Sequence, residues 1–539
     1  MVKSSTEGFE SRRAPLFLVL IPFGLGLLVN HIFPLAQTTT PVLLSLLLLL
    51  LLFGFSSRLR GYSWHLIFSV VLFSLGGLYG ARFSPPLLPQ DDHHPAPPRE
   101  ESIRVDPIQN FVAPPYSDSQ IGLGQMEGER DLLYYNTPAG GQSEPLPSGF
   151  WVEIYGVQRD LDELIPDPGF RQYLMNRGVT RGIDSLKQAE IVGLANLQHA
   201  TFSQLLQESK STLASGSSPL DPSTRIYQAL VLGQRLGLDR EQKEIFRDTG
   251  TAHLFAISGL HVGLVGGFLF FFFRQIGVNR PVQIAGTLVI LLFYVLLTGA
   301  TPSAVRAFLM ITFLVGAKIV HRAYCPTSAL AASALVVLLI DPSQLFTLGF
   351  QLSYTVVLSI LVFGAPLAQL LLESTDPEYW LPGQSGSPFH RLRRWAFASF
   401  SISLAAFFGS AALIIDHFQI LPLSSILLNL ILILPATGVL LLGFVSLVCG
   451  LLGALWISTP LNWIAGLLIR TMTEIVSLTA DVPASAIPIS FSNNWAGPAG
   501  VLLFLGITFW TANQPRFRVR YLSLPAASLL LTILLGVTL

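Results

Sequence analysis

The chain has 539 residues, of which 51% are hydrophobic and only 12% are charged, and its formal net charge is zero. Soluble domains carry roughly 25% charged residues, so the composition excludes an ordinary soluble globular protein and indicates membrane-spanning helices. The neutral balance gives the chain as a whole no electrostatic case for binding nucleic acid. Cys325 and Cys449 lie in or beside apolar spans, so we expect neither a structural disulfide nor a metal site from them.

Residues 1–85 contain three apolar spans, at 15–33, 41–55 and 64–82. Basic residues precede the first span, as in a signal peptide, but this span is long and lacks a clear small-x-small cleavage site. Because a second span follows within ten residues, we expect three retained transmembrane helices.

A Pro-rich linker then leads into an insert, residues 86–200, which we expect to form a small β-rich domain. Residues 149–156 alternate between apolar and polar side chains as a strand does. Residues 101–200 hold seven Lys and Arg against fourteen Asp and Glu, a net charge of −7.

Residues 201–252 are predicted to be an amphipathic helical connector. Apolar side chains recur at helical spacing from Thr224 onwards, and a charged helix follows over 238–247 with Asp239 as its expected N-cap. This connector is expected either to lie on the membrane surface or to brace the helix bundle.

Residues 253–539 are predicted to be a transmembrane domain, which brings the total to about thirteen spans. The span at 423–436 is short and is a candidate broken helix, whereas 459–481 has the pattern of an interfacial helix. The expected spans are 254–273, 283–298, 304–320, 326–341, 352–371, 396–415, 423–436, 438–457, 497–512 and 521–538.

Basic residues in the loops indicate the orientation. With thirteen spans and a cytoplasmic N-terminus, six basic clusters all fall on the cytoplasmic side, as the positive-inside rule expects. The acidic insert then faces outward, into the periplasm or the extracellular space. The clusters are 3–13, Arg58 with Arg60, Arg274 with Arg280, Lys318 with Arg322, 391–394 and 516–520.

The segment 253–267 combines two histidines, a serine and four glycines at the start of an apolar span. Ionisable groups at membrane depth are costly and are usually functional. His253 and His261 are eight residues apart, about 80° around a helix, so they are candidate pore-lining residues. Packing at the helix end is the alternative, and a metal site is disfavoured because no third ligand is near in sequence.

The same segment carries two further candidates. Gly259 and Gly263 form a small-xxx-small spacing that predicts a smooth face on which another helix packs closely. Ser258 lies three residues before His261, which admits a serine-nucleophile hypothesis, although no oxyanion site is evident.

Polar residues also mark two later spans. Thr298, Pro302 and Ser303 precede Arg306, where a proline break beside a charged side chain suggests a translocation path. Arg306 suits phosphate by bidentate contact, with an interfacial snorkelling arginine as the alternative. Gln351 and Ser353 either line a pore or form helix–helix hydrogen bonds.

These segments, in this order, make the chain resemble the ComEC family of competence proteins. The block at 253–263 is the most specific, and Asn429 belongs to a weaker one. The matching motifs are Leu232-Gly, Gly237-Leu-Asp, Phe246-Arg-Asp-Thr-Gly250, 253–263, 298–307, Asp341-Pro, 349–354, Leu421-Pro-Leu with Asn429 and Pro435, and 169–178.

The resemblance implies an inner-membrane channel for transforming DNA, with an OB-like domain at 86–200 and a competence-type channel domain at 253–539. Family members usually end in a metallo-β-lactamase-like nuclease domain, but no His-x-His-x-Asp-His cluster occurs here. The resemblance therefore implies the channel part only, with no enzyme activity, metal or cofactor. Trp151, Tyr155 and Tyr173 are weak candidates for stacking on DNA bases, because the acidic insert repels phosphate.

The leading hypothesis is a multi-pass inner-membrane channel that passes single-stranded DNA into the cytoplasm. The alternatives are a transporter of another polyanion or small molecule on the same fold and, less favoured, an intramembrane serine hydrolase using Ser258. No Gly-x-x-x-x-Gly-Lys loop occurs, so the driving force must come from a partner. The resemblance implies a periplasmic DNA receptor, a cytoplasmic helicase-like translocase and, as a further option, a separate nuclease chain.

Overall fold

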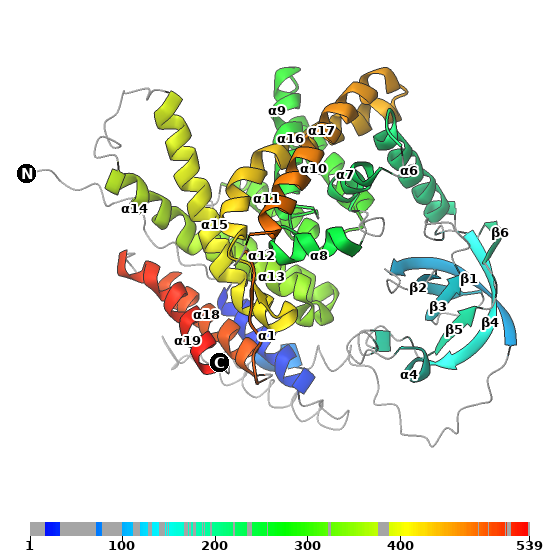
Figure 1. Ribbon diagram of the computed structural model, residues 1–539, viewed down its shortest axis with the longest axis horizontal. Coiled ribbons are helices and arrows are strands. Elements are labelled where there is room, and N and C mark those ends of the chain that lie inside the picture. The colour runs from blue at the N-terminus through cyan, green and yellow to red at the C-terminus, as the bar shows by residue number, and fades with distance from the viewer. Residues whose placement is uncertain are drawn as a thin grey trace, which may run out of the picture.

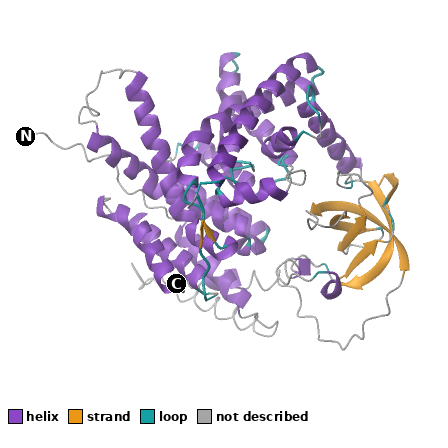
Figure 2. Ribbon diagram, viewed as in Figure 1, coloured by secondary structure: helices purple, strands orange, loops and turns teal. Residues whose placement is uncertain are grey.

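The computed structural model describes residues 17–32, 72–77, 100–111, 119–127, 132–138, 150–165, 181–185, 189–194, 197–218, 221–233, 240–255, 257–321, 325–375, 388–482, 485–493, 495–512 and 519–536, with single positions at 146, 148, 171, 174, 175, 179, 187 and 514. These residues form a large helical body with a compact β domain beside it (Figure 1). All but two short strands gather in that domain (Figure 2). The predicted spans at 41–55 and 64–82 lie outside the described residues, apart from 72–77.

The β domain is a closed barrel of five strands. Their order is β1-β2-β3-β5-β4, and β4 pairs back onto β1 to close the sheet; β6 extends it from β4. Only β3 and β5 run parallel, and the other pairs are antiparallel. The strands are β1 (Glu100–Phe111), β2 (Ser119–Met126), β3 (Leu132–Pro138), β4 (Phe150–Asp160), β5 (Arg181–Ser185) and β6 (Glu190–Leu194), with the short α4 (Leu161–Leu164) after β4.

Alternating side chains fill this barrel. Val152 and Ile154 of β4 are fully buried with Leu133 and Tyr135 of β3. Full closure protects the sheet edges that an open sheet would expose. The prediction of a small β-rich domain in the insert is confirmed.

Three helices connect the barrel to the membrane helices: α6 (Leu197–Ala214), α7 (Pro222–Leu232) and α8 (Arg240–Asp248). Asp221 caps α7, and Gly233 ends it in the left-handed conformation at φ 76°. Residues 229–232 of α7 are completely buried. α7 therefore braces the bundle rather than lying on its surface.

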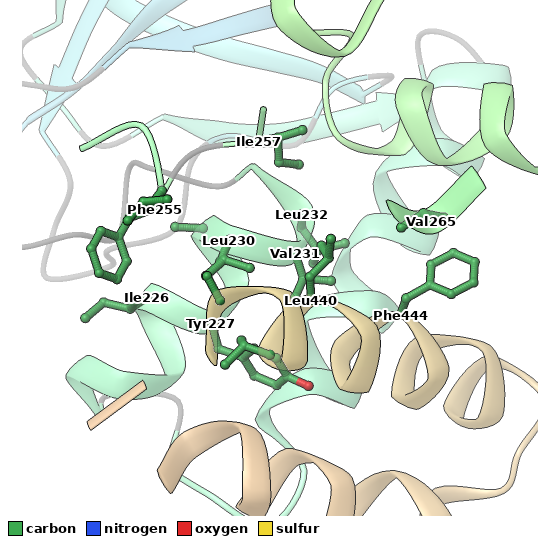
Figure 3. Packing of buried hydrophobic residues seen from close by; sticks show 14 of the residues in the cluster. Ile226, Tyr227, Leu230, Val231, Leu232, Phe255, Ile257, Val265, Leu440 and Phe444 are labelled. Atoms are coloured by element: carbon green, nitrogen blue, oxygen red, sulfur yellow. The ribbon is translucent and has the colours of Figure 1, made fainter. Parts of the chain in front are cut away.

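The largest core is built around α7. Figure 3 shows Tyr227, Leu230 and Val231 of α7 among Leu440 and Phe444 of α16. The ring of Phe444 also packs edge-on against Tyr294, 5.6 Å between centroids. This core joins the connector to apolar side chains from 262–307 and 428–476.

The remaining helices follow the predicted spans closely in most places. They are α1 (Phe17–Ile32), α9 (Gly259–Gln275), α10 (Arg280–Leu297), α11 (Pro302–Ile319), α12 (Pro326–Ile340), α13 (Leu348–Ser359), α14 (Ala365–Thr375), α15 (Pro388–Phe418), α16 (Ser425–Leu451), α17 (Leu455–Ala480), α18 (Ala496–Ala512) and α19 (Leu524–Gly536). Shorter pieces are η2 (Pro342–Phe346), the π-helical turn η3 (Ile360–Gly364), η5 (Val519–Ser523), β7 (Ile420–Leu421) and β8 (Ile487–Pro488).

Within the described residues, six helices are long and apolar enough to cross a membrane: 280–297, 302–319, 348–372, 391–418, 425–451 and 455–480. Several shorter apolar helices accompany them, among them α9, α12 and α18. The count of thirteen spans stays a prediction.

Two predictions about the later helices concern 423–457 and 459–481. The expected break between 423–436 and 438–457 is wrong, because α16 runs unbroken through Pro435. Proline removes one backbone donor, which a membrane helix tolerates where neighbouring groups satisfy the freed carbonyl. The segment 459–481 belongs to α17, a helix long and apolar enough to cross a membrane, and its interfacial placement stays a prediction.

Candidate functional site

The N-terminus of α9 is closed by a reciprocal cap. The Ser258 hydroxyl accepts the backbone N–H of His261 at 3.4 Å, and Nδ1 of His261 accepts the backbone N–H of Ser258 at 3.3 Å. This is a capping box in which histidine takes the place that Glu or Gln usually holds. His261 is buried, so the cap accounts for a histidine at this depth.

Arg306 lies in the second turn of α11 and is only 5% exposed. Its Nη1 donates to the backbone carbonyl and the hydroxyl of Ser353 on α13. The Ser353 hydroxyl in turn lies 3.1 Å from that of Ser303, and the guanidinium carbon lies 5.8 Å from the ring centroid of Tyr354. The structure thus brings Ser303 and Arg306, nominated together, into contact with Ser353, which the sequence nominated in a separate segment.

The positive charge of Arg306 has no carboxylate partner among the described residues. Its Nε is also buried without a hydrogen-bond acceptor there. Buried charges in proteins are ordinarily paired, and an unpaired one is costly. The arrangement is therefore one in which an anion would be stabilised.

The first turn of α9 lies against this guanidinium, and the first turns of α11 and α13 pack against each other nearby. A Cβ added to Gly259 would meet Nη2 of Arg306, so glycine lets the start of α9 approach the charge. Gly349 in the first turn of α13 faces Pro302 in the first turn of α11. Helix N-termini carry partial positive charge and bind anions, so the backbone adds to the field of Arg306.

The other nominated residues lie around this cluster in structural roles. The Thr298 hydroxyl donates to the Val295 carbonyl at 2.8 Å and ends α10. Gln351 donates to the Leu345 carbonyl at 3.1 Å and ties α13 to η2. His253 is exposed in the turn before α9, its Nδ1 3.0 Å from the Gly250 carbonyl, so it does not share a helix face with His261.

Asn429 on α16 differs from these residues. Its Oδ1 is buried and finds no hydrogen-bond donor in the described part of the chain. The backbone just before it is fastened, because the Ser424 hydroxyl donates to the carbonyls of Thr249 and Ser485. Asn429 thus has a buried amide oxygen without a partner in this part of the structure.

The predicted packing face at Gly259 and Gly263 is only half present. Gly259 faces Arg306 and Gly266 faces Leu291, whereas nothing in the described structure lies within 4 Å of a Cβ added to Gly263 or Gly267. The glycines therefore fall on different sides of α9, since only Gly259 and Gly266 meet neighbours.

The barrel presents two of the three predicted stacking aromatics. Trp151 and Tyr155 lie two residues on either side of Glu153 on β4, and hence on one face of the strand. The Lys187 ammonium lies 5.0 Å from the Tyr155 ring centroid. Tyr173 lies outside the described residues.

A buried hub at Asn462 was not foreseen from the sequence. Its Oδ1 accepts from the hydroxyls of Tyr227 (3.1 Å) and Ser446 (2.6 Å). Its Nδ2 donates to the Thr212 carbonyl at 2.8 Å and to the carbonyl and hydroxyl of Ser215. One amide thereby joins α7, α16, α17 and the end of α6. The available signal was an amide within a largely apolar helix, which needs partners at membrane depth.

No group of three or more His, Cys, Asp or Glu side chains able to hold a metal occurs in the described ranges. Cys325 and Cys449 form no disulfide within the described residues, and Sγ of Cys325 lies 3.3 Å from the Thr327 hydroxyl.

Long apolar helices packed around buried polar clusters, with a separate barrel, define a multi-pass membrane protein. A family profile described as Competence protein matches residues 230–514, which is more than half of the chain. The chain therefore belongs to the competence protein family.

Individual relatives agree with this assignment. The chain is 32% identical over 312 residues to ComE operon protein 3 of Bacillus subtilis, covering 56% of this chain and 35% of the relative. It is 26% identical to Recombination protein 2 of Haemophilus influenzae, over 48% of this chain and 31% of the relative. It is 25% identical to an uncharacterized protein of Aquifex aeolicus, over 52% of this chain and 58% of the relative. The chain thus spans about a third of the first two relatives, and no solved structure matches it.

Proposed function

We propose that this chain forms the inner-membrane channel through which single-stranded DNA enters the cytoplasm during natural competence. The observation that carries the proposal is the environment of Arg306. Its guanidinium is buried without a carboxylate partner among the described residues, lies against the first turn of α9, and belongs to the region that matches the competence family. A phosphodiester backbone supplies the anion that this arrangement lacks.

The path would run past residues whose polar atoms remain available. Moving a polyanion through lipid requires donors that replace its hydration. Arg306 supplies such donors, with Ser303 and Ser353 beside it, while Asn429 offers an amide whose oxygen has no partner in the described chain. Thr298, Pro302 and Gln351 shape the helix ends that hold this cluster in place.

The barrel would serve as an OB-like domain on the outer face of the membrane. Its five strands, closed in the order 1-2-3-5-4, support this assignment. The face bearing Trp151 and Tyr155 would be a weak contact for single strands, since Glu153 lies between them.

The proposed orientation keeps the N-terminus in the cytoplasm. The single helix α16 removes one predicted crossing and α17 supplies another, so the loop charges keep the same sides. The driving force would come from a helicase-like translocase in the cytoplasm, with a periplasmic receptor delivering DNA and nuclease chemistry, where needed, on another chain.

The test is uptake of labelled DNA into a DNase-protected cytoplasmic pool. A deletion strain of a naturally competent host would carry wild type, Arg306→Ala, Arg306→Lys or the control Arg391→Ala, an exposed arginine at the start of α15. We expect Arg306→Ala to abolish uptake, Arg306→Lys to restore part of it because the charge remains without the bidentate fork, and Arg391→Ala to behave as wild type.

Membrane levels and thermal unfolding of each variant separate misfolding from loss of the path. Normal uptake by well-folded Arg306→Ala would refute the proposed path. If the deletion strain takes up DNA normally but loses the uptake of another anionic solute, the result would favour the alternative function, a transporter of a different polyanion or small molecule.

The serine-hydrolase hypothesis has its own test. The cap occupies the Ser258 hydroxyl and Nδ1 of His261 with backbone partners, so no observation favours nucleophilic chemistry there. Labelling by a serine-reactive phosphonate that disappears in Ser258→Ala would revive it.

A further inference from the structure

A cavity of about 360 Å³ lies between the α6–α7 loop and the middle of α17. Ser217, Ser218 and Asp221 of the loop line one wall, and Trp463 and Arg470 of α17 line the other. Small-molecule sites begin at roughly this volume, so the cavity suits a compact polar group rather than a large ligand.

Asp221 and Arg470 form an ion pair in the wall of this cavity. Nη2 of Arg470 donates to Oδ2 of Asp221 at 2.8 Å, and Nε of Arg470 lies 3.4 Å from the Ser223 hydroxyl. The Arg470 side chain is 64% exposed and that of Asp221 is 22% exposed. Asp221 is fixed from behind, because its carboxylate also caps α7 through the backbone N–H of Ser223. The wall therefore offers a cation with donors to spare beside a fixed anion.

The cavity straddles a polarity boundary on the exposed face of α17. Trp463 (66% exposed) and Leu467 (54%) mark the apolar side. Arg470, Thr471 and Glu474, also exposed, follow in the next turns. The site thus combines a charged pair with an exposed apolar edge that lipid chains can cover.

We propose that this cavity is a phospholipid site that selects an ethanolamine headgroup, with Arg470 binding the phosphate and Asp221 binding the ammonium. The acyl chains would leave along Trp463 and Leu467. A zwitterionic headgroup presents its two charges as the complement of the Asp221–Arg470 pair. The inference goes beyond DNA uptake and does not depend on it.

The chemistry disfavours a nucleic-acid strand here. A phosphodiester chain brings only negative charge, which Asp221 would repel, and it offers no cation to pair with that carboxylate. The exposed apolar side chains at the mouth also give a polyanion nothing to bind. A lipid uses both the charge pair and the apolar edge.

Lipid binding at this place would act on the core. Asn462 lines the cavity and is the hub that joins the helices around it, and Tyr227, which also lines the cavity, donates to it. A headgroup seated there would clamp the α6–α7 loop onto α17. A lipid that binds the native state but not the unfolded state stabilises the native state.

The experiment measures lipid retention and thermal unfolding of the full chain, purified in detergent and titrated with dioleoyl phosphatidylethanolamine, phosphatidylglycerol or phosphatidylcholine. We expect ethanolamine lipid to bind best, because glycerol has no ammonium and the methylated choline cannot donate hydrogen bonds to Asp221. Arg470→Gln should weaken binding about tenfold, the effect of losing one hydrogen bond to a charged group.

Asp221→Asn is the sharper variant. Asparagine still caps a helix, so α7 keeps its N-terminal cap while the negative charge disappears. We expect the preference for ethanolamine over glycerol lipid to vanish. Glu474→Gln, one turn beyond Arg470 on the same exposed face and outside the cavity lining, is the matched control and should leave both lipids unchanged.

Equal retention of all three lipids by the wild type would overturn the proposal. Displacement of bound lipid by inorganic phosphate would reassign the cavity to free anions, and displacement by a single-stranded oligonucleotide would reassign it to DNA. Because these readouts use purified protein and no uptake, a failed lipid site leaves the Arg306 path untouched, and the reverse also holds.

Discussion

Replacing Asn462 by alanine tests whether one buried amide holds the connector helices to the membrane bundle. The substitution removes five hydrogen bonds and leaves the hydroxyls of Tyr227 and Ser446 without the acceptor they share. Interhelical hydrogen bonds in membrane proteins average about 0.6 kcal/mol each, which gives about 3 kcal/mol for five. Orphaning a buried polar group costs about 1–3 kcal/mol, so two orphaned hydroxyls would cost about 2–6 kcal/mol, a range that includes this value.

The assay is a denaturant titration of the purified chain in mixed micelles, followed by helix content. We expect Asn462→Ala to lose about 3 kcal/mol of unfolding free energy on this estimate. Asn462→Asp should lose at least as much, because its second carboxylate oxygen would face the Thr212 and Ser215 carbonyls to which the amide now donates.

Asn429→Ala is the matched control for this experiment. It removes the same side chain from a neighbouring helix, but its Oδ1 has no partner among the described residues. We expect its stability to stay close to wild type while DNA uptake falls. We infer that the Asn462 amide stabilises the fold through its hydrogen bonds, whereas the Asn429 amide does not. Equal destabilisation by Asn429→Ala and Asn462→Ala would refute this distinction.

Two further predictions concern glycine contacts and acid stability. Gly259→Ala should lower DNA uptake, because the added Cβ would push against Nη2 of Arg306. Gly263→Ala is the control and should leave uptake unchanged, because no described atom lies within 4 Å of its added Cβ. Equal uptake by the two variants would contradict this prediction. Burial raises the pKa of Asp221, but its hydrogen bonds with the Ser223 backbone and Arg470 outweigh burial and hold that pKa below its ordinary value. The ionised Asp221 carboxylate therefore stabilises the folded state fully above its unfolded-state pKa of about 3.9. This stabilisation is lost as the pH falls through the lower pKa of the folded state. Thermal unfolding of wild type and Asp221→Asn should converge in that acid range, and a constant difference there would count against the ion pair.

Hydropathy and helical periodicity predicted most of the membrane helices from the sequence. The spans expected at 283–298 and 304–320 correspond to α10 (Arg280–Leu297) and α11 (Pro302–Ile319). Both helices begin with proline in the first turn, where its missing N–H costs nothing. Pro435 misled the same reasoning, because a proline within a long apolar helix removes only one hydrogen bond and α16 continues through it.

The candidate site was predictable as a set of residues but not as an arrangement. Arg306 and Ser353 are 47 residues apart, and each was nominated on its own. Their contact depends on the loops that bring the N-terminal turns of α11 and α13 together. No local sequence pattern indicates this arrangement. Asn462 was missed for a related reason, since its partners near Thr212 lie 250 residues earlier in the chain.

The polar residues of the bundle fall into two groups that the sequence alone could not separate. Ser258 and His261 cap one another, and Gln351 ties two segments together, so their hydrogen-bonding groups are used within the fold. Nε of Arg306 and Oδ1 of Asn429 have no partner in the described chain. Burying unpaired polar atoms costs free energy, and a fold retains that cost at sites where a ligand supplies the partner. Substitutions in the first group should therefore act through stability, whereas those in the second should act through transport at normal stability.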